Sequence, residues 1–248
     1  MHVSGLDRAS AVPLYLQLKQ WLELQIASGQ LAPHSRVPSE RELSEQFAIS
    51  RMTARQALAE LIQEGRLYTR AGKGTFVAEP KIRQNLQALT GFTEDMRARG
   101  LVPRTRVLAQ QIVPATGPIA QALNVPEETP VLRLQRLRLA DDAPMALENS
   151  TLHVPDLEQL LACDLSGSLY AVLRERFAIV PAEAIQEFEA ALPQPHERAL
   201  LQVPEGAPVL KIQRTTFDAR GQPFEYVASI YRGDRYRFVA RLVREGQP

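Results

Sequence analysis

The N-terminal third of the chain follows the order of three helices and a glycine-tipped hairpin. Apolar residues at three- and four-residue steps predict the first helix. Ser39, with Glu42 three residues later, forms a capping-box pattern that begins the second helix, and Ser50 can cap the third. The helices are expected at residues 13–28, 40–46 and 50–64, and the hairpin at residues 66–78. This order predicts a winged helix-turn-helix domain.

The start of the third predicted helix carries cationic and polar side chains suited to reading DNA. Arg51 and Arg55 are four residues apart and therefore share one helix face. In a helix-turn-helix the second helix enters the major groove N-terminus first, and an arginine fork matches guanine O6 and N7. Glycines on both sides of Lys73 would let the hairpin tip approach a phosphate backbone. The DNA-binding residues predicted from this pattern are Arg51, Thr53, Arg55, Gln56, Gly72, Lys73 and Gly74.

Two other interpretations of this stretch are weaker. Arg51 and Arg55 alone could form an ordinary solvated helix face. The glycine-rich tip could bind a nucleotide phosphate, but that motif requires lysine followed directly by serine or threonine, and Gly74 separates Lys73 from Thr75. The cap, the arginine spacing and the hairpin together favour DNA binding.

Composition limits the remaining classes of protein. A length of 248 residues suits two domains, and the net charge of +1 gives no global field. Residues 50–77 contain five basic and two acidic side chains, a local charge of +3. One cysteine and four scattered histidines predict neither a disulfide nor a metal site, and no cofactor is expected. Without a signal-peptide pattern or a transmembrane run, a cytoplasmic protein with no membrane partner is expected.

The segment Leu14–Ala78 resembles the DNA-binding domain of GntR-type bacterial transcription regulators. The resemblance rests on the stretch VPSERELSEQFAISRMTARQALAELIQEGRLYTRAGKGTFVA, which begins at Val37. It implies double-stranded operator DNA as a partner. It adds Ser39 and Arg41 to the predicted contacts, although Arg41 by itself could be a plain helix-surface residue.

The rest of the chain contains an internal repeat. Val125–Arg136 (VPEETPVLRLQR) resembles Val203–Arg214 (VPEGAPVLKIQR), which begins 78 residues later. Each copy is followed by a polar turn and a second strand pattern, so two antiparallel hairpins are predicted. Helical stretches are expected at residues 117–123, 156–162, 168–177 and 195–201. A sheet with helices packed on it is the expected result.

Strand alternation places unusual side chains together. Arg136 and Arg138 continue the apolar face of the first repeated strand, and Glu225 and Tyr231 share a face of a later one. The arginines could lie at an exposed end of the sheet or line a cavity that holds an anion. Acid and phenol groups on one face suit a polyol ligand or an ordinary wet surface. Alternation alone leaves these possibilities open.

The C-terminal part resembles the effector domain, called UTRA, of the HutC-type branch of GntR regulators. The motifs are GFTEDMRARG, LQRLRLADDAPMALENS, GSLYAVL and FEYVASIYRGDRYRF. The resemblance implies a chorismate-lyase-like fold without catalysis. By the same resemblance, a loop with Phe92 and Thr93, together with two arginines, grips a phosphate in members that sense sugar phosphates. The implied effector-binding residues are Phe92, Thr93, Arg136, Arg138, Glu148, Ser168, Tyr170, Glu225 and Tyr231.

These patterns together predict an α+β protein. We expect a winged helix-turn-helix domain over residues 1–78, a linker over 79–90 and an effector-binding and dimerisation domain with a mainly antiparallel sheet over 91–248. The expected function is a homodimeric repressor released from a palindromic operator by a small anion such as an amino-sugar phosphate. Two alternatives are a sugar-phosphate enzyme with a regulatory DNA-binding domain and a ligand-independent DNA-binding dimer.

Overall fold

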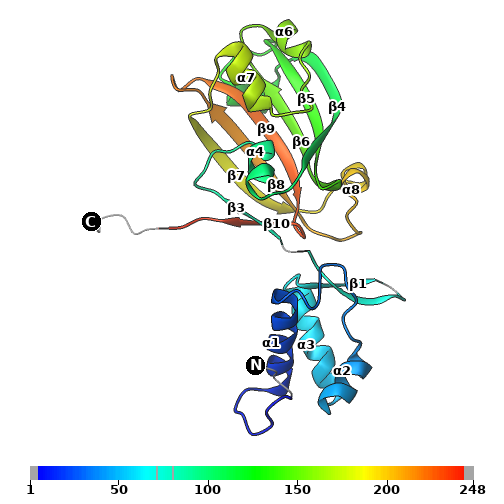
Figure 1. Cartoon of the computed structure of the whole chain (residues 1–248). Helices are drawn as coiled ribbons and strands as arrows, with labels where there is room; N and C mark the ends of the chain where they lie inside the picture. Colours follow the sequence, from blue (N-terminus) through cyan, green and yellow to red (C-terminus); the bar gives the residue numbers. More distant parts are fainter. Residues whose placement is uncertain (1–4, 71, 80, 243–248) are drawn as a thin grey trace, which may run out of the picture. The chain divides into compact units, whose positions relative to one another are not determined.

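A computed structural model describes residues 5–70, 72–79 and 81–242 (Figure 1). The chain divides into two compact units, Met1–Lys81 and Ile82–Pro248, which we describe separately. The combination of a helical unit and a unit built on an antiparallel sheet confirms the predicted α+β class.

The first unit contains three helices and an antiparallel hairpin. Its elements are α1 (Leu14–Ala27), α2 (Glu40–Phe47), α3 (Arg51–Gln63), β1 (Leu67–Arg70) and β2 (Gly74–Val77). The Ser39 hydroxyl accepts from the amide of Glu42, whose carboxylate accepts from the Ser39 amide, so the predicted capping box is confirmed. Ser50 caps α3 by accepting from the Thr53 amide. The predicted winged helix-turn-helix order is therefore present.

A single apolar core holds this unit together. Leu18 and Leu22 of α1 and Leu61 of α3 are fully buried in it. Ile62 of α3 lies outside this core and is 37% exposed. Trp21 lies at the core margin with its ring centroid 4.9 Å from that of Phe47.

The second unit is built on a six-stranded antiparallel sheet. The strands in spatial order are β4 (Pro103–Pro114), β5 (Pro130–Ala140), β6 (Ala143–Leu152), β9 (Pro223–Arg232), β8 (Val209–Phe217) and β7 (Glu183–Ala191). The predicted hairpins are β5–β6 and β8–β9, and they meet where β6 pairs with β9. Sequence reasoning missed the two edge strands, β4 and β7.

The order of the strands shows that the repeat extends through the whole sheet. One half runs β4, α5 (Gly117–Ala122), β5 and β6, and the other runs β7, α8 (Pro195–Leu201), β8 and β9. Leu137 and Leu147 pack with Leu201 of α8 on one face. Ala120 of α5 packs with Val131 and Tyr226 on the same face. The duplicated helices therefore cover the same side of the sheet.

Three helices outside the repeat cover the opposite face. These are α4 (Phe92–Ala98), α6 (Leu157–Leu161) and α7 (Leu169–Phe177), of which α4 and α7 lie over the sheet in Figure 1. Leu132 and Leu134 of β5 pack against Leu160 and Leu173 of these helices. Because side chains alternate along a strand, Arg136 and Arg138 face the same side, as predicted.

Two expectations for the start of this unit require correction. Residues 82–85, within the predicted linker 79–90, form strand β3, which pairs in parallel with β10 (Tyr236–Val239). Phe92 and Thr93 were expected in a loop, but they are the first residues of α4. The gap in the description at residue 80 lies inside the predicted linker.

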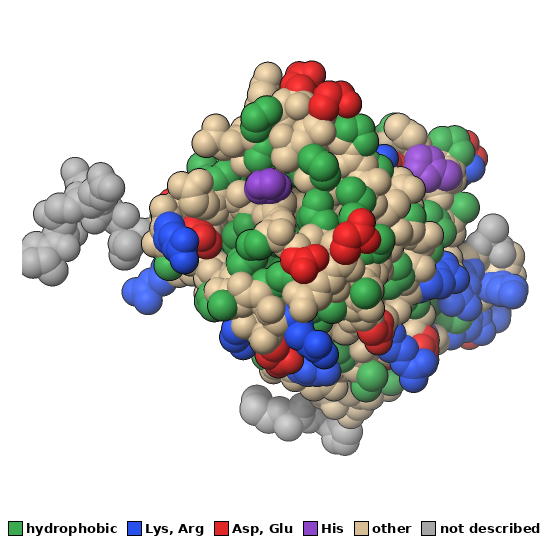
Figure 2. All heavy atoms as spheres, turned by 90° about the horizontal axis from the view of Figure 1, so that it is seen from above, with side chains coloured by type: hydrophobic (Ala, Val, Ile, Leu, Met, Phe, Trp, Pro, Cys, Tyr) green, Lys and Arg blue, Asp and Glu red, His purple; other side chains and the backbone are tan. Residues whose placement is uncertain are grey.

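The surface of the molecule is mixed. On the face seen in Figure 2, charged side chains of both signs occur among hydrophobic and polar ones, in agreement with the net charge of +1. None of the helices in the described part of the chain is long and apolar enough to cross a membrane. Within residues 5–70, 72–79 and 81–242, no three His, Cys, Asp or Glu side chains are grouped to hold a metal ion.

We predict that Leu22→Ala destabilises the first unit by about 2–5 kcal/mol, because it leaves a cavity in a closed core. Leu24→Ala, two residues away on the same helix, is the matched control. Leu24 is 59% exposed, so its replacement should cost about 0.5 kcal/mol or less. Trp21 is the only tryptophan of the chain, so its fluorescence in urea follows this unit alone. Equal midpoints for the two variants would contradict the assigned core.

Candidate functional site

The first turn of α3 presents polar side chains to solvent. Arg51 and Gln56 are exposed, and neither side chain has a hydrogen bond or ion pair with another described residue. The hydroxyl of Thr53, by contrast, lies 2.8 Å from the Ser50 hydroxyl and is partly committed to the cap. Arg51 in the first turn and Gln56 in the second are therefore free to meet a ligand.

Arg55 is held by a neighbouring helix. Its Nε lies 2.9 Å from Oε1 of Glu40, and its Nη2 lies 2.9 Å from Oε2 of the same carboxylate. The hydrogen bond from Arg55 lowers the pKa of Glu40. The Arg55 guanidinium is still 59% exposed, so it can reach a ligand only by sharing or leaving Glu40. Arg41 forms a similar exposed pair with Glu45 at 3.4 Å.

The tip of the hairpin takes a backbone shape that favours glycine. Gly72 and Gly74 have φ angles of 70° and 106°, in the left-handed region. The turn closes through a hydrogen bond of 2.9 Å from the Lys73 amide to the Arg70 carbonyl. The Lys73 side chain is exposed between the two glycines. The turn thus carries one cation on a backbone with little steric bulk.

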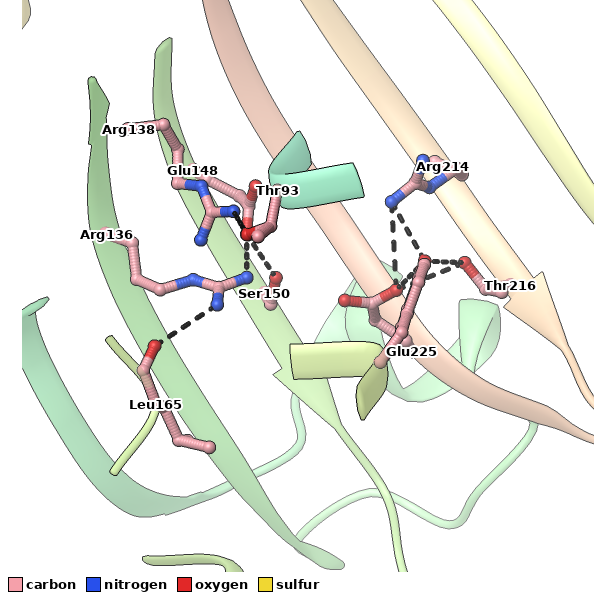
Figure 3. Close-up of polar contacts among 10 residues, drawn as sticks. Thr93, Arg136, Arg138, Glu148, Ser150, Leu165, Arg214, Thr216 and Glu225 are labelled. Carbon is pink, nitrogen blue, oxygen red and sulfur yellow. Dashed lines mark hydrogen bonds and ion pairs between the residues drawn. The ribbon is translucent and has the colours of Figure 1, made fainter. Parts of the chain in front are cut away.

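In the second unit, two arginines of β5 are buried under α4 and α7. Arg136 Nη2 donates to Oε1 of Glu148 on β6, and Arg136 Nη1 lies 3.4 Å from the carbonyl oxygen of Leu165. Arg138 Nη2 donates to Thr93 Oγ1 at 3.1 Å (Figure 3), and its guanidinium carbon lies 4.6 Å from the Phe92 ring centroid. Arg136 and Arg138 are only 3% and 2% exposed. The sequence thus places two positive charges inside the unit.

The two arginines differ in how far they are neutralised. Burial by itself would raise the pKa of Glu148, but the charges of Arg136 and Arg138 outweigh it and hold this pKa at about 2. Arg138 has no carboxylate of the described residues in hydrogen-bond contact, and burial lowers its pKa. Its Nε and Nη1 are buried without a hydrogen-bond partner among the described residues. Unpaired buried donors on a cation favour an anionic ligand.

A second arginine–glutamate pair lies across the same face, on β8 and β9. Arg214 Nη2 donates to the Tyr170 hydroxyl at 3.0 Å and lies 3.9 Å from Oε2 of Glu225. The same carboxylate oxygen accepts from Tyr170 at 2.8 Å and from Thr216 at 3.2 Å (Figure 3). Burial and then the charge of Glu225 raise the pKa of Tyr170. The phenol therefore stays protonated and acts as a donor.

Sequence reasoning did not select Arg214, although a signal for it was present. Arg214 ends the second copy of the repeat at the position where Arg136 ends the first, 78 residues earlier. Glu94 was also missed, and its carboxylate accepts a hydrogen bond from Ser168. Ser168 in addition caps α7 by accepting from the Ala171 amide at 3.2 Å, so both roles of its hydroxyl are internal.

A small cavity brings most of the predicted effector residues together. It has a volume of about 20 Å³, room for roughly one water molecule. Its lining includes Phe92, Thr93, Arg136, Arg138, Glu148, Ser168, Tyr170 and Glu225, together with Arg214. Tyr231 lies outside this set and lines an adjoining cavity with Glu148 and Ser229. Burial, followed by the charge of Glu148, raises the pKa of Tyr231 to about 12.

Comparison with known proteins accounts for both units. Residues 14–77 match the family described as "Bacterial regulatory proteins, gntR family", and residues 98–237 match the UTRA domain. The HTH-type transcriptional repressor NagR of Bacillus subtilis is 43% identical over 97% of this chain and 99% of its own length. A histidine utilization repressor of Pseudomonas putida is 34% identical over 93% of this chain and 92% of its own.

A solved structure gives the same result for the fold. The crystal structure of PhnF from Mycobacterium smegmatis superposes with a TM-score of 0.65 at 33% identity, and covers 93% of this chain and 99% of that one. The relatives named here are transcriptional regulators rather than enzymes. The chain thus belongs to the GntR family of bacterial regulatory proteins, with an N-terminal helix-turn-helix and a C-terminal UTRA domain.

Proposed function

We propose that this protein is a homodimeric repressor that releases a palindromic operator when a sugar phosphate, first of all an amino-sugar phosphate, binds its UTRA unit. The observation that carries this proposal is Arg138, a buried cation with unpaired donors and no bonded carboxylate. A phosphate oxyanion supplies acceptors that match these donors. The action takes place in the cytoplasm, where both DNA and phosphorylated metabolites are found.

On the DNA side, α3 enters the major groove and the hairpin tip contacts the backbone. Arg51 and Gln56 are free to reach base edges, and Lys73 is free to meet a phosphate. Arg55 contributes once the DNA competes with Glu40 for its guanidinium. Ser39, Arg41, Thr53, Gly72 and Gly74 complete the proposed contact set. One such domain reads few base pairs, so a twofold dimer reading two half-sites supplies the specificity.

On the effector side, the phosphate lies against Arg138, Thr93 and Arg136, and the remainder meets Glu148, Glu225 and Tyr231. The cavity of about 20 Å³ is too small for a sugar phosphate, so side chains or α4 must move when it binds. Coupling to DNA follows if the effector prefers the arrangement that cannot bind the operator. Several kcal/mol of differential affinity are needed to change the operator from mostly bound to mostly free.

The proposed functional domains keep the boundaries 1–78 and 91–248, and residues 79–90 join them. Strand β3, within this joining segment, belongs to the sheet pair formed with β10. From residue 82 onward, the joining segment is therefore tied to the effector unit by backbone hydrogen bonds.

The DNA-binding proposal predicts that Arg51→Ala weakens operator binding by about 1–3 kcal/mol and relaxes the base preference at one position of each half-site. Lys73→Ala is the contrasting control. It should weaken binding to all sequences evenly and reduce the slope of log K against log salt by about 1. Gel-shift titrations on operator and scrambled DNA at several salt concentrations measure both effects. Wild-type affinity of Arg51→Ala for the operator would refute the groove assignment.

The effector proposal predicts that Arg138→Gln keeps operator binding but loses the response to sugar phosphates. Arg133→Gln is the matched control, because Arg133 lies on the same strand with its side chain exposed. Wild type and control should show a rise in melting temperature with glucosamine 6-phosphate or N-acetylglucosamine 6-phosphate, since ligand binding stabilises the folded state. An equal rise in Arg138→Gln would contradict the anion role. Intact operator binding without response to any sugar phosphate would instead favour the ligand-independent dimer.

A further inference from the structure

Three adjoining cavities lie on the functional face of the second unit, and Arg214 lines all of them. The inner cavity is the one that contains Arg136 and Arg138. The middle cavity, also of about 20 Å³, lies over Ser229 and Tyr231 and shares Glu148 with the inner one. The outer cavity has a volume of about 230 Å³ and is lined by residues 84–90 together with β7.

The three cavities lie over neighbouring strands and cross the sheet from β5 to β7. Arg136 on β5, Glu148 on β6 and Ser229 on β9 stand directly opposite one another, and Ile212 on β8 continues the row. On β7 this row ends at Phe188, and Gln186 lies two residues away on the same face, opposite Arg214. Five neighbouring strands span about 19 Å at the usual strand spacing. One sugar ring with its phosphate is too short to fill that length.

The chemistry changes along this line. The inner cavity holds Arg138, whose Nε and Nη1 lack partners among the described residues. Arg214 donates to Tyr170 and is paired with Glu225, and only its Nε is left without a partner in that part of the chain. Beyond Arg214, the amides of Gln84 and Gln186 line both the middle and the outer cavity. Neither amide has a hydrogen bond to another residue in the described part of the chain. Apart from Arg214 and Glu183, whose opposite charges both line the outer cavity, this end offers uncharged donors and acceptors rather than a second anion site.

Other amides of the outer cavity serve the fold. Gln87 Nε2 donates to the Arg241 carbonyl at 2.6 Å, and Asn85 Oδ1 accepts from the Gln87 amide at 3.0 Å. These hydrogen bonds fix the segment of residues 84–90, which forms one side of the outer cavity. Because an amide both donates and accepts, Gln84 and Gln186 suit the hydroxyl and amide groups of a neutral sugar unit.

We propose that the effector pocket has a distal subsite, formed by Arg214, Gln84 and Gln186, which takes a second, uncharged sugar unit linked to the phosphorylated one. This inference rests on the proposed function, because it assumes that the phosphate lies at Arg138. It identifies the effector class as phosphorylated disaccharides. Arg214 is the specificity-determining residue at the boundary, since it touches all three cavities.

Calorimetric titration of the full-length protein tests the subsite with two matched probes. One probe is N-acetylglucosamine 6-phosphate, and the other is the β-linked dimer of the same sugar with the phosphate on its non-reducing unit. Wild type should bind the dimer about tenfold more tightly, as expected from one or two additional net hydrogen bonds.

Gln186→Leu should remove this preference, because leucine fills a similar volume without donating or accepting. Gln213→Leu is the matched control, since Gln213 is exposed on the opposite face of the neighbouring strand, and it should keep the preference. Equal affinities of wild type for the two probes would overturn the subsite and leave the repressor proposal standing. An equal loss of preference in both variants would also overturn it. If neither probe binds, the sugar-phosphate proposal falls together with the subsite.

Discussion

Charges buried under α4 and α7 set the conditions for the rest of the second unit. Arg136, Arg138, Glu148 and Glu225 are each less than a tenth exposed on one face of the sheet. Removing such groups from water is unfavourable unless each finds a partner. Arg136 pairs with Glu148 and is left with one unpartnered nitrogen, Nε, whereas Arg138 has no bonded carboxylate and two unpartnered donors among the described residues. The fold thus leaves a buried positive charge whose free donors match the acceptors of an anion.

The internal repeat explains why two arginine–glutamate pairs lie on one face of the sheet. Each half contributes a strand, a helix and a hairpin, and the two hairpins meet at the β6–β9 pair. Because both copies of the repeat place an arginine at the matching position of their first hairpin strand, Arg136 and Arg214 lie on the same face, on opposite sides of the central strands. The environments of the two arginines differ. Arg136 bonds a carboxylate directly, whereas Arg214 bonds a phenol and lies farther from its carboxylate.

Local sequence predicted the elements whose signals are local. The capping box at Ser39, the cap at Ser50 and the glycines of the wing depend on neighbours within a few residues, and the structure contains all of them. The two duplicated hairpins were predicted from the similarity between their sequences rather than from apolar periodicity. Edge strands β4 and β7 are half exposed and rich in polar residues, so they lack the apolar alternation that identifies a strand. Strand β3 was taken for a linker because its four residues gain a partner only from β10, about 150 residues away.

In the candidate site too, some features followed from the local sequence and others only from contacts between distant segments. The chain alone established which strand faces carry Arg136, Arg138, Glu225 and Tyr231, since alternation along a strand is a property of the backbone. It could not establish that Arg55 is held by Glu40, that Phe92 and Thr93 open a helix, or that Arg214 reaches Tyr170. Those outcomes depend on contacts between segments far apart in the chain. Only the packing of helices onto the sheet decides which buried charge finds a partner and which one remains available to a ligand.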